Sequence, residues 1–163
     1  MSYQFSFEVW QGIANKIAKV GIGAYLGTPT TTDVDGTYTR LLGTFTNVQS
    51  EGFELDVPSG KVKYNPVDGV NRTFNLNYSG DVSCPTNNDE VTIGIEVTRS
   101  AVAAIVTGTE TTVKCRTNST PYTFSKIFPL DLEVGDLIEI QIKGDATFTA
   151  TMIEFATTLT KFY

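Results

Sequence analysis

Apolar and polar residues alternate along the chain from about residue 42 onward, with a period of two. A period of two places successive side chains on opposite faces of a strand, so the pattern predicts strands with one buried face and one wet face. In the last clear run Glu139 and Gln141 occupy the polar phase, which indicates an antiparallel sheet with one face in solvent. The clearest apolar runs are Phe53, Leu55, Val57; Phe74, Leu76, Tyr78; Val91, Ile93, Ile95, Val97; and Ile138, Ile140, Ile142.

Turn-forming residues separate these runs. Clusters of Pro, Gly, Asn, Asp and Ser favour the backbone dihedrals that a chain reversal requires. They stand at residues 58–60, 65–69, 85–89, 117–121 and 144–145. Roughly seven or eight strands with little helix between them must cover their apolar faces against each other, which predicts an all-β, antiparallel two-sheet sandwich.

The first 40 residues show a different pattern. Residues 3–9 alternate like a strand, whereas Trp10, Ile13, Ile17 and Val20 recur at helical spacing and predict a short amphipathic helix. The apolar face of this helix could pack on the chain's own sandwich or in a groove of another subunit. Both possibilities remain open from the sequence.

A stretch rich in Gly, Thr, Asp and Pro runs from Gly27 to Thr39 and is typical of a linker or long loop. It would separate the amphipathic segment from the sandwich. We therefore expect an N-terminal attachment segment over residues 1–40 and one sandwich domain over residues 41–163, and a chain of this length can bury a full core.

Charge and composition exclude several classes of function. The net charge is -6 and the 12 Lys and Arg residues form no basic stripe, so nucleic acid is not an expected partner. No apolar run approaches the ~20 residues that span a bilayer, so no membrane partner is expected either. The chain has no histidine, which excludes Ser-His-Asp and Cys-His catalysis and His-rich zinc sites. No cofactor, metal site or catalytic residue is expected.

The cysteines and two of the acidic residues are the remaining candidates for chemistry. Cys84 and Cys115 each fall in the apolar phase of a strand pattern, and we expect two buried free thiols in preference to a disulfide. Glu139 and Glu154 lie on neighbouring predicted strands, so they could form a pair of carboxylates for glycoside hydrolysis. Acids on the wet face of a sheet usually serve only as solvating charges, and we expect no enzyme.

Near the C-terminus, Leu132-Glu133-Val134-Gly135-Asp136-Leu137-Ile138 resembles the Leu-x-x-Gly-Asp-x-Val element of C1q and TNF-like jelly rolls. Gly135 would supply a free dihedral angle and Asp136 would cap the turn before the next strand. The segments 52–55, 60–64 and 72–80 resemble the opening strands of trimeric jelly rolls in fibres and head decorations of tailed bacteriophages. The resemblance covers roughly residues 42–163.

The resemblance implies a homotrimer around a threefold axis, in which one edge of each sandwich lies against its neighbours. Some aromatic residues should then leave the monomer core to face the axis, although each could instead pack within its own sandwich. The candidates are Tyr122, Phe124, Phe128, Phe155, Phe162 and Tyr163.

Our first functional hypothesis is a virion structural protein, a trimeric capsid decoration or fibre component. The segment around Trp10, Ile13, Ile17 and Val20 would anchor it to another virion protein, such as the major capsid protein or a fibre or tail component. The alternative is a receptor- or glycan-binding module for host attachment, with polar loop residues at 87–89 and 118–119 as contacts. A glycosidase is the third hypothesis.

Overall fold

A computed structural model of the chain describes residues 21–41, 43, 45–56 and 61–161. Every regular element in these ranges is a β-strand, as the alternation predicts, and none of the described residues forms a helix that could cross a bilayer. The strands are β1 Gly21–Leu26, β2 Thr30–Val34, β3 Thr39–Arg40, β4 Phe45–Glu51, β5 Phe53–Asp56, β6 Lys61–Tyr64, β7 Arg72–Ser83, β8 Asp89–Arg99, β9 Val102–Ile105, β10 Thr111–Cys115, β11 Tyr122–Leu132, β12 Leu137–Gly144 and β13 Phe148–Lys161.

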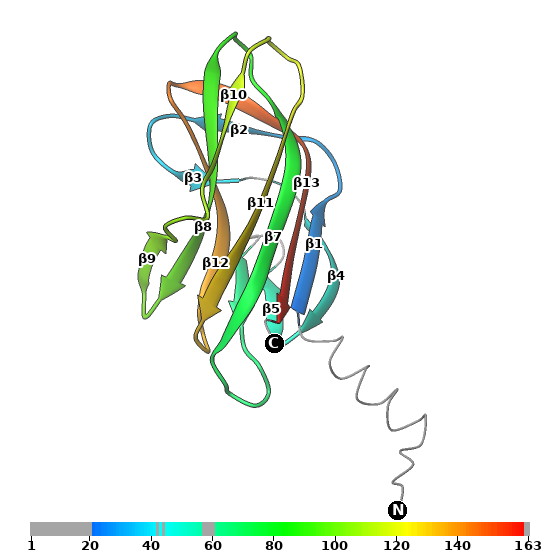
Figure 1. Ribbon diagram of the computed structural model, residues 1–163, viewed down its shortest axis with the longest axis vertical. Helices are drawn as coiled ribbons and strands as arrows, with labels where there is room; N and C mark the ends of the chain where they lie inside the picture. The colour runs from blue at the N-terminus through cyan, green and yellow to red at the C-terminus, as the bar shows by residue number, and fades with distance from the viewer. Residues whose placement is uncertain (1–20, 42, 44, 57–60, 162–163) are drawn as a thin grey trace, which may run out of the picture.

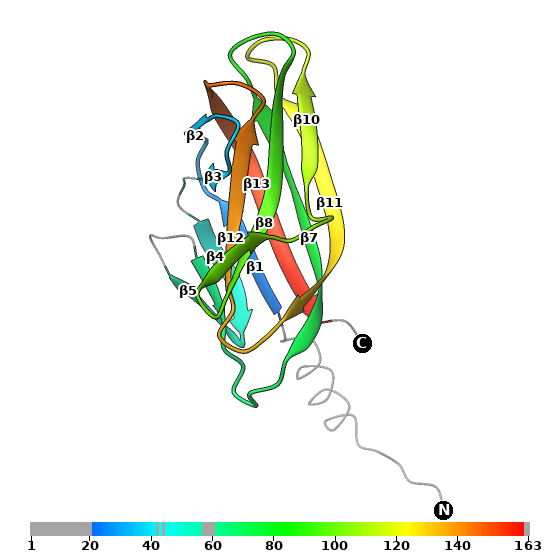
Figure 2. The same ribbon diagram turned by 90° about the vertical axis from the view of Figure 1, so that its left-hand side faces the viewer.

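The strands form two antiparallel sheets that face each other (Figures 1 and 2). Sheet A has the order β11-β7-β13-β1-β4, with β2 also paired to β13. Sheet B has the order β10-β8-β12-β6-β5, with β3 also paired to β12 and β9 to β8. The predicted antiparallel two-sheet sandwich is therefore confirmed.

The core lies between the sheets and follows the period of two. On β7 the side chains of Phe74, Leu76 and Tyr78 are at most 1% exposed, and the residues between them face solvent. Two aromatic groups fill the space between the sheets, with ring centroids 5.1 to 6.2 Å apart, within the range of favourable edge and offset contacts. One group is Phe53, Tyr64 and Phe74, and the other is Tyr78, Phe124 and Phe155.

The prediction of a linker from Gly27 to Thr39 is wrong. Within this stretch β2 pairs with β13, and its residues Thr32 and Val34 are 4% and 2% exposed. Threonine suggested a loop, yet a β-branched side chain fits a half-buried strand well. Because β1 also lies between β13 and β4, the sandwich includes residues from Gly21 onward, and the expected boundary at residue 41 falls too late. The expected helix around Trp10 to Val20 lies outside the described residues.

The expected wet face at Glu139 and Gln141 is also wrong. Both side chains are 6% exposed on the side of β12 that faces away from the core. The Arg40 guanidinium donates to Glu139 Oε1 at 3.0 Å, the Lys61 ammonium pairs with the same oxygen, and Gln141 Nε2 donates to Glu139 Oε2 at 3.0 Å. Cations from β3 and β6 therefore cover this carboxylate.

Candidate functional site

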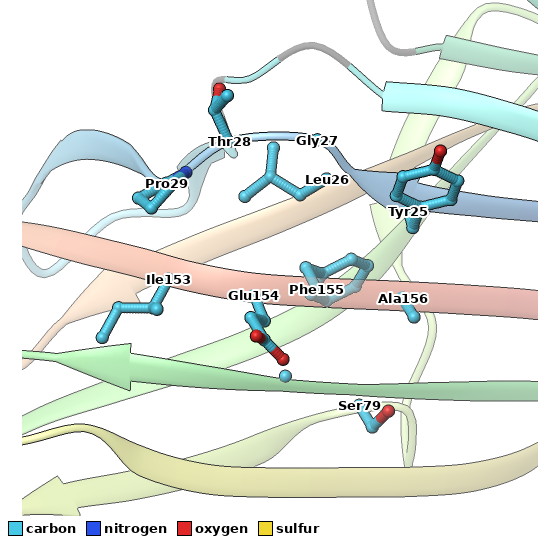
Figure 3. Close-up of a pocket in the computed structure, with 11 residues that line it drawn as sticks. Tyr25, Leu26, Gly27, Thr28, Pro29, Ser79, Ile153, Glu154, Phe155 and Ala156 are labelled. Carbon is cyan, nitrogen blue, oxygen red and sulfur yellow. The ribbon is translucent and has the colours of Figure 1, made fainter.

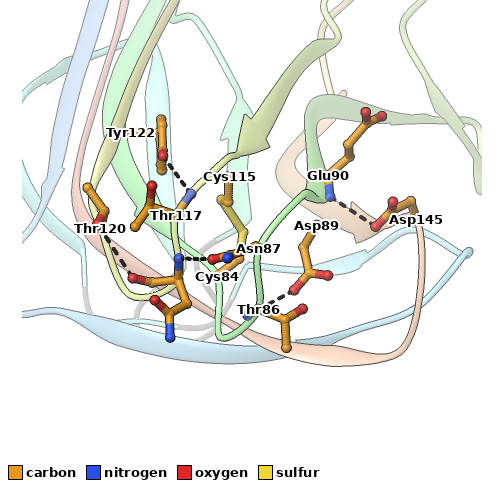
Figure 4. Close-up of a disulfide and its surroundings, with 11 residues drawn as sticks. Cys84, Thr86, Asn87, Asp89, Glu90, Cys115, Thr117, Thr120, Tyr122 and Asp145 are labelled. Atoms are coloured by element: carbon orange, nitrogen blue, oxygen red, sulfur yellow. Dashed lines mark hydrogen bonds between the residues drawn. A yellow bond between two sulfur atoms is a disulfide. The ribbon is translucent and has the colours of Figure 1, made fainter.

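Two loops gather at one end of the sandwich and form the tip loops, residues 84–88 and 116–121 (Figure 4). The first follows β7 of sheet A, and the second leads from β10 of sheet B into β11 of sheet A. The described chain begins at the opposite end, where Gly21 pairs with Thr160 near the end of β13. The two ends of the long axis therefore differ: the tip loops lie at one end, and the described chain enters the sandwich at the other (Figure 1).

Cys84 and Cys115 form a disulfide beneath the tip loops, with their Cα atoms 5.9 Å apart (Figure 4). Their predicted burial is confirmed, at 1% and 0% exposed, whereas the prediction of free thiols is wrong. The pairing of β10 with β8 places Cys115 opposite Asp89, and only residues 85–88 separate Asp89 from Cys84 at the end of β7. This proximity depends on the fold, so the spacing of two cysteines could not show it.

Hydrogen bonds join the two tip loops beyond the disulfide. The backbone N–H of Asn118 donates to Asn87 Oδ1 at 2.7 Å, that of Ser119 to the Cys84 carbonyl at 2.7 Å, and that of Asn88 to the Cys115 carbonyl at 2.6 Å. Asn88 and Ser119 adopt φ of +70° and +55°, in the left-handed region that tight turns use. The loops are thus held as one unit.

The structure brings together the polar loop residues that the sequence suggested as contacts. Asn87, Asn88, Asn118 and Ser119 come from different loops and are all exposed. Their amide and hydroxyl groups can donate and accept hydrogen bonds, which is the chemistry that recognises sugars and polar peptide surfaces. Among the described residues, no three Cys, Asp or Glu side chains gather as metal ligands.

Glu139 and Glu154, by contrast, are not brought together. Glu139 belongs to β12 in sheet B, where it is buried and ion-paired, and Glu154 belongs to β13 in sheet A, where it is exposed. The two strands are consecutive in the chain but lie in different sheets, because the connection after Gly144 crosses the sandwich. The hypothesis of a carboxylate pair for glycoside hydrolysis is wrong for these residues.

Glu154 instead lines a pocket of about 450 Å³ on the outer side of sheet A (Figure 3). Tyr25, Ser79 and the loop that follows β1 contribute the other walls. At its base β7 approaches β13 closely at a bulge between Met152 and Glu154, and a Cβ on Gly80 would lie 2.3 Å from the Glu154 carbonyl oxygen. The lining residues offer one carboxylate, one phenol and the hydroxyls of Ser79 and Thr28, without a second acid or a base for catalysis.

The aromatic candidates for a trimer interface separate into three groups. Phe124 and Phe155 are 4% and 2% exposed and pack within their own sandwich. Tyr122 and Phe128 are half-buried, and the Tyr122 hydroxyl accepts from the Thr117 backbone at 2.8 Å. Phe162 and Tyr163 lie outside the described residues.

The large apolar side chains that do reach the surface were not among these candidates. Ile127 on β11 is 67% exposed, Val102 on β9 is 69% exposed and Tyr25 on β1 is 45% exposed. The sequence did indicate the exposure of Ile127, because Ile127 lies on the same face of β11 as the polar residues Thr123 and Ser125. An apolar residue at a solvent-facing position of a strand is typical of a contact surface.

The turn that starts β12 has the structure that the Leu-x-x-Gly-Asp element predicts. Gly135 has a φ of +95°, and the Asp136 carboxylate accepts from the Glu133 backbone at 2.8 Å. Asp136 is 2% exposed and binds the Arg99 guanidinium, whose hydrogen bonds to this carboxylate raise the pKa of Arg99. The element therefore ties the corner of sheet B to the end of β8.

No protein-family model and no curated protein matches the sequence. Among solved structures, the chain resembles Eiger TNF from S. frugiperda, with a TM-score of 0.59 and 10% identity over 88% of this chain and 92% of that one. It also resembles murine APRIL crystallised at pH 5.0, with a TM-score of 0.54 and 13% identity over 86% of this chain and 98% of that one. At such identities the likeness shows the fold alone, and the chain folds as a TNF-like jelly roll.

Proposed function

We propose that the chain is a non-catalytic virion structural protein, a homotrimeric capsid decoration or fibre component that is attached at one end and displayed at the other. The observation that carries the proposal is the difference between the two ends of the sandwich. Gly21, where residues 1–20 join the fold, lies at the end opposite the disulfide-tied tip loops. An attachment segment at one end leaves the tip loops free to point away from a particle.

Self-assembly is supported by the outer face of sheet A. Ser125, Ser79 and Ala156 lie side by side in one cross-strand row. Ile127 lies on β11 in the next row of the same face, beside Asn77. The small side chains of the first row let another copy approach the backbone of β11 and β7 closely, beside the pocket that Tyr25 and Glu154 line, and Ile127 supplies exposed apolar area. In the proposed trimer this face lies toward the threefold axis.

Cyclic symmetry fits the proposed attachment. Rotation about a single threefold axis keeps the long axes of the three copies in the same sense, so all three attachment segments would leave at one end. Three anchors on one particle also reinforce each other through their high effective concentration.

The mass of the protein in solution tests the trimer. Light scattering should give three times the mass of one chain, and Ile127→Glu should give the mass of one folded chain, because it places a charge on the proposed interface. Val67→Glu is the matched control, since Val67 is fully exposed in the turn between β6 and β7 and belongs to no strand. A wild-type mass of one chain, or a trimer that survives Ile127→Glu, would contradict the proposed interface.

Attachment is tested with virus particles that lack the protein. A double substitution, Ile13→Glu with Ile17→Glu, should leave the trimer intact and abolish co-sedimentation with the particles, because it destroys the apolar stripe of the attachment segment. Deletion of residues 1–40 is unsuitable, since it would remove three strands. Normal attachment of the substituted protein would contradict an anchor at this segment.

The second candidate function is recognition of a host surface glycan or protein, and one observation favours it. Tip loops tied by a disulfide and reciprocal hydrogen bonds present Asn88 and Asn118 in a fixed geometry, which lowers the entropy lost on binding. Asn88→Gly removes the amide but keeps the left-handed backbone. On a glycan array the wild type should give saturable binding that Asn88→Gly weakens and Val67→Ser does not. No binding by the wild type would contradict glycan recognition and favour a purely structural role.

A further inference from the structure

A groove of about 700 Å³ lies at the open edge of the sandwich, between β9 of sheet B and β11 of sheet A. β8 pairs with β10 along one half and with β9 along the other, and β9 diverges from β11 (Figure 1). Phe128 closes one end by packing on Gly108, and Arg99 closes the other by donating to the Asp131 carbonyl at 3.2 Å.

The floor of this groove consists of core-facing positions that lack a cover. Ala104 stands opposite Val97, whose side chain is buried at 8% exposed, so Ala104 and Val102 lie on the core-facing side of sheet B. Both are nevertheless exposed, Val102 at 69%. The reason is that sheet A ends at β11, so over the described ranges no strand lies above β9.

The free edge of β11 shows what kind of chain could fill this space. The Asp131 carbonyl points away from β7, because it accepts from Arg99. In an antiparallel ladder this direction recurs at every second residue, so the backbone groups of Ile127 and Pro129 also point outward from the free edge of β11. Ile127 can pair with an added strand, whereas Pro129 has no N–H to donate, which is a common feature of edge strands. An occupant must therefore be held largely by its side chains.

The chain itself contains a segment with this pattern. Tyr3, Phe5, Phe7 and Val9 alternate with Ser, Gln, Ser and Glu, so an extended conformation would place all four apolar side chains on one face. We propose that residues 3–9 lie extended in this groove of their own chain, alongside β11, with the apolar face on Val102 and Ala104. In this arrangement the strand that the alternation at residues 3–9 predicts lies beside β11.

The geometry permits the same chain to reach the groove. Gly21, Thr160, Asn75 and Pro129 form one cross-strand row of sheet A, so β1 is three strand positions from β11. An occupant beside β11 lies one position further, so at ~4.8 Å per strand the separation is about 19 Å. The eleven residues from 10 to 20 would span about 16 Å as a helix and about 36 Å when extended. The linking segment is therefore long enough when it is largely extended.

This docking goes beyond the proposed attachment and does not depend on it. It would fix residues 10–20 at both ends, since residues 3–9 bind the groove and Gly21 enters β1. The segment around Trp10, Ile13 and Ile17 would then cross the end of the sandwich as a loop, whether or not a particle binds it.

Thiol accessibility in the full chain tests the docking. The two native cysteines are joined in the disulfide, so Val102→Cys introduces a single free thiol on the groove floor. Its rate of modification by a maleimide should be about tenfold or more below that of Val67→Cys, a fully exposed reference site. Adding Phe5→Ser with Phe7→Ser should bring the Val102→Cys rate up to the reference, and Phe5→Leu with Phe7→Leu should keep it slow.

Three outcomes would overturn the proposal. Equal rates at Val102→Cys and Val67→Cys in the otherwise intact chain would show an open groove. Slow modification that persists after Phe5→Ser with Phe7→Ser would show that a different occupant, such as a second copy, covers the groove. Protection that is lost on dilution would assign residues 3–9 to a neighbouring copy. None of these readouts involves a particle, so they are independent of the test of attachment.

Discussion

Asn87 and Asn118, 31 residues apart in the sequence, are joined across the tip loops, since the Asn118 backbone N–H donates to Asn87 Oδ1 at 2.7 Å. The bond lies beside the Cys84–Cys115 disulfide, which joins the same two loops (Figure 4). The side-chain bond fixes the loops relative to each other in the folded state. The disulfide does the same and also restricts the unfolded chain, so it acts on both states of the protein.

Reduction of the disulfide should lower the melting temperature. The cysteines close a loop across a sequence separation of 31 residues, for which loss of chain entropy predicts about 3 to 4 kcal/mol of stabilisation. For a domain of this size that corresponds to about 10 °C. Calorimetry with and without a reductant measures the shift, and the Cys84→Ala, Cys115→Ala double variant should show none. Equal melting temperatures for the oxidised and reduced wild type would contradict the pairing.

Gly80→Ala should destabilise the fold by about 2 kcal/mol or more, because overpacking forces backbone to move. The added Cβ would meet the Glu154 carbonyl oxygen at 2.3 Å, and that oxygen belongs to the backbone of β13. Gly36→Ala is the control, since no atom lies within 4 Å of the position that its methyl group would take and its φ requires no glycine. Urea denaturation of both variants measures the difference, and equal midpoints would show that the close approach at the bulge is not rigid.

Glu139→Gln should cost about 1 to 2 kcal/mol of unfolding free energy, whereas Glu154→Gln should change it by less than about 0.5 kcal/mol. Removal of the Glu139 charge leaves Arg40 and Lys61 without their shared carboxylate, and the cost is moderate because both cations are about one-third exposed. Glu154 is exposed and takes part in no ion pair within the described ranges. Denaturation curves compare the two variants, and the reverse order would contradict the burial at β12.

Tyr78 should make stability fall at alkaline pH. Burial raises the pKa of Tyr78 above its ordinary value near 10, with a further contribution from Glu110, while the hydrogen bond to Thr111 opposes the shift. The unfolded chain then releases the phenolic proton first, so stability is complete below about pH 10 and is lost as the pH rises toward the folded-state pKa.

Tyr78→Phe should therefore be less stable than the wild type near neutral pH, because it loses the hydrogen bond to the Thr109 carbonyl, and should lose less stability above about pH 10. Part of the alkaline slope should remain, since burial and Glu110 also raise the pKa of Tyr38. Unfolding free energies measured across this range provide the check. Parallel curves for the two proteins would contradict burial of the Tyr78 hydroxyl.

The strands were predictable because a period of two is a local property of the chain. Val91, Ile93 and Ile95 are read as a buried row from the sequence alone, and the structure buries each at 1% or less. The turn at Gly135 and Asp136 was predictable for the same reason, since its chemistry is contained within a few residues.

The errors concern contacts between distant parts of the chain. The burial of Glu139 depends on Arg40, 99 residues earlier. The Cys84–Cys115 bond depends on the pairing of β8 with β10, which brings Cys115 next to the loop that follows β7. β2 was missed because its threonines serve equally in loops and strands. The tip loops were predictable as polar loops, but only the fold shows that Asn87 and Asn118 adjoin.

The disulfide has a mechanical consequence. Cys84 follows the last residue of β7 in sheet A, and Cys115 ends β10 in sheet B, so a covalent bond clamps the two layers together at the tip. Tension applied to a tip loop is shared between both layers, and the layers cannot begin to peel apart there. Separation must start at the far end, where the chain enters the fold, so the tip is the end of the molecule that better resists a pulling force.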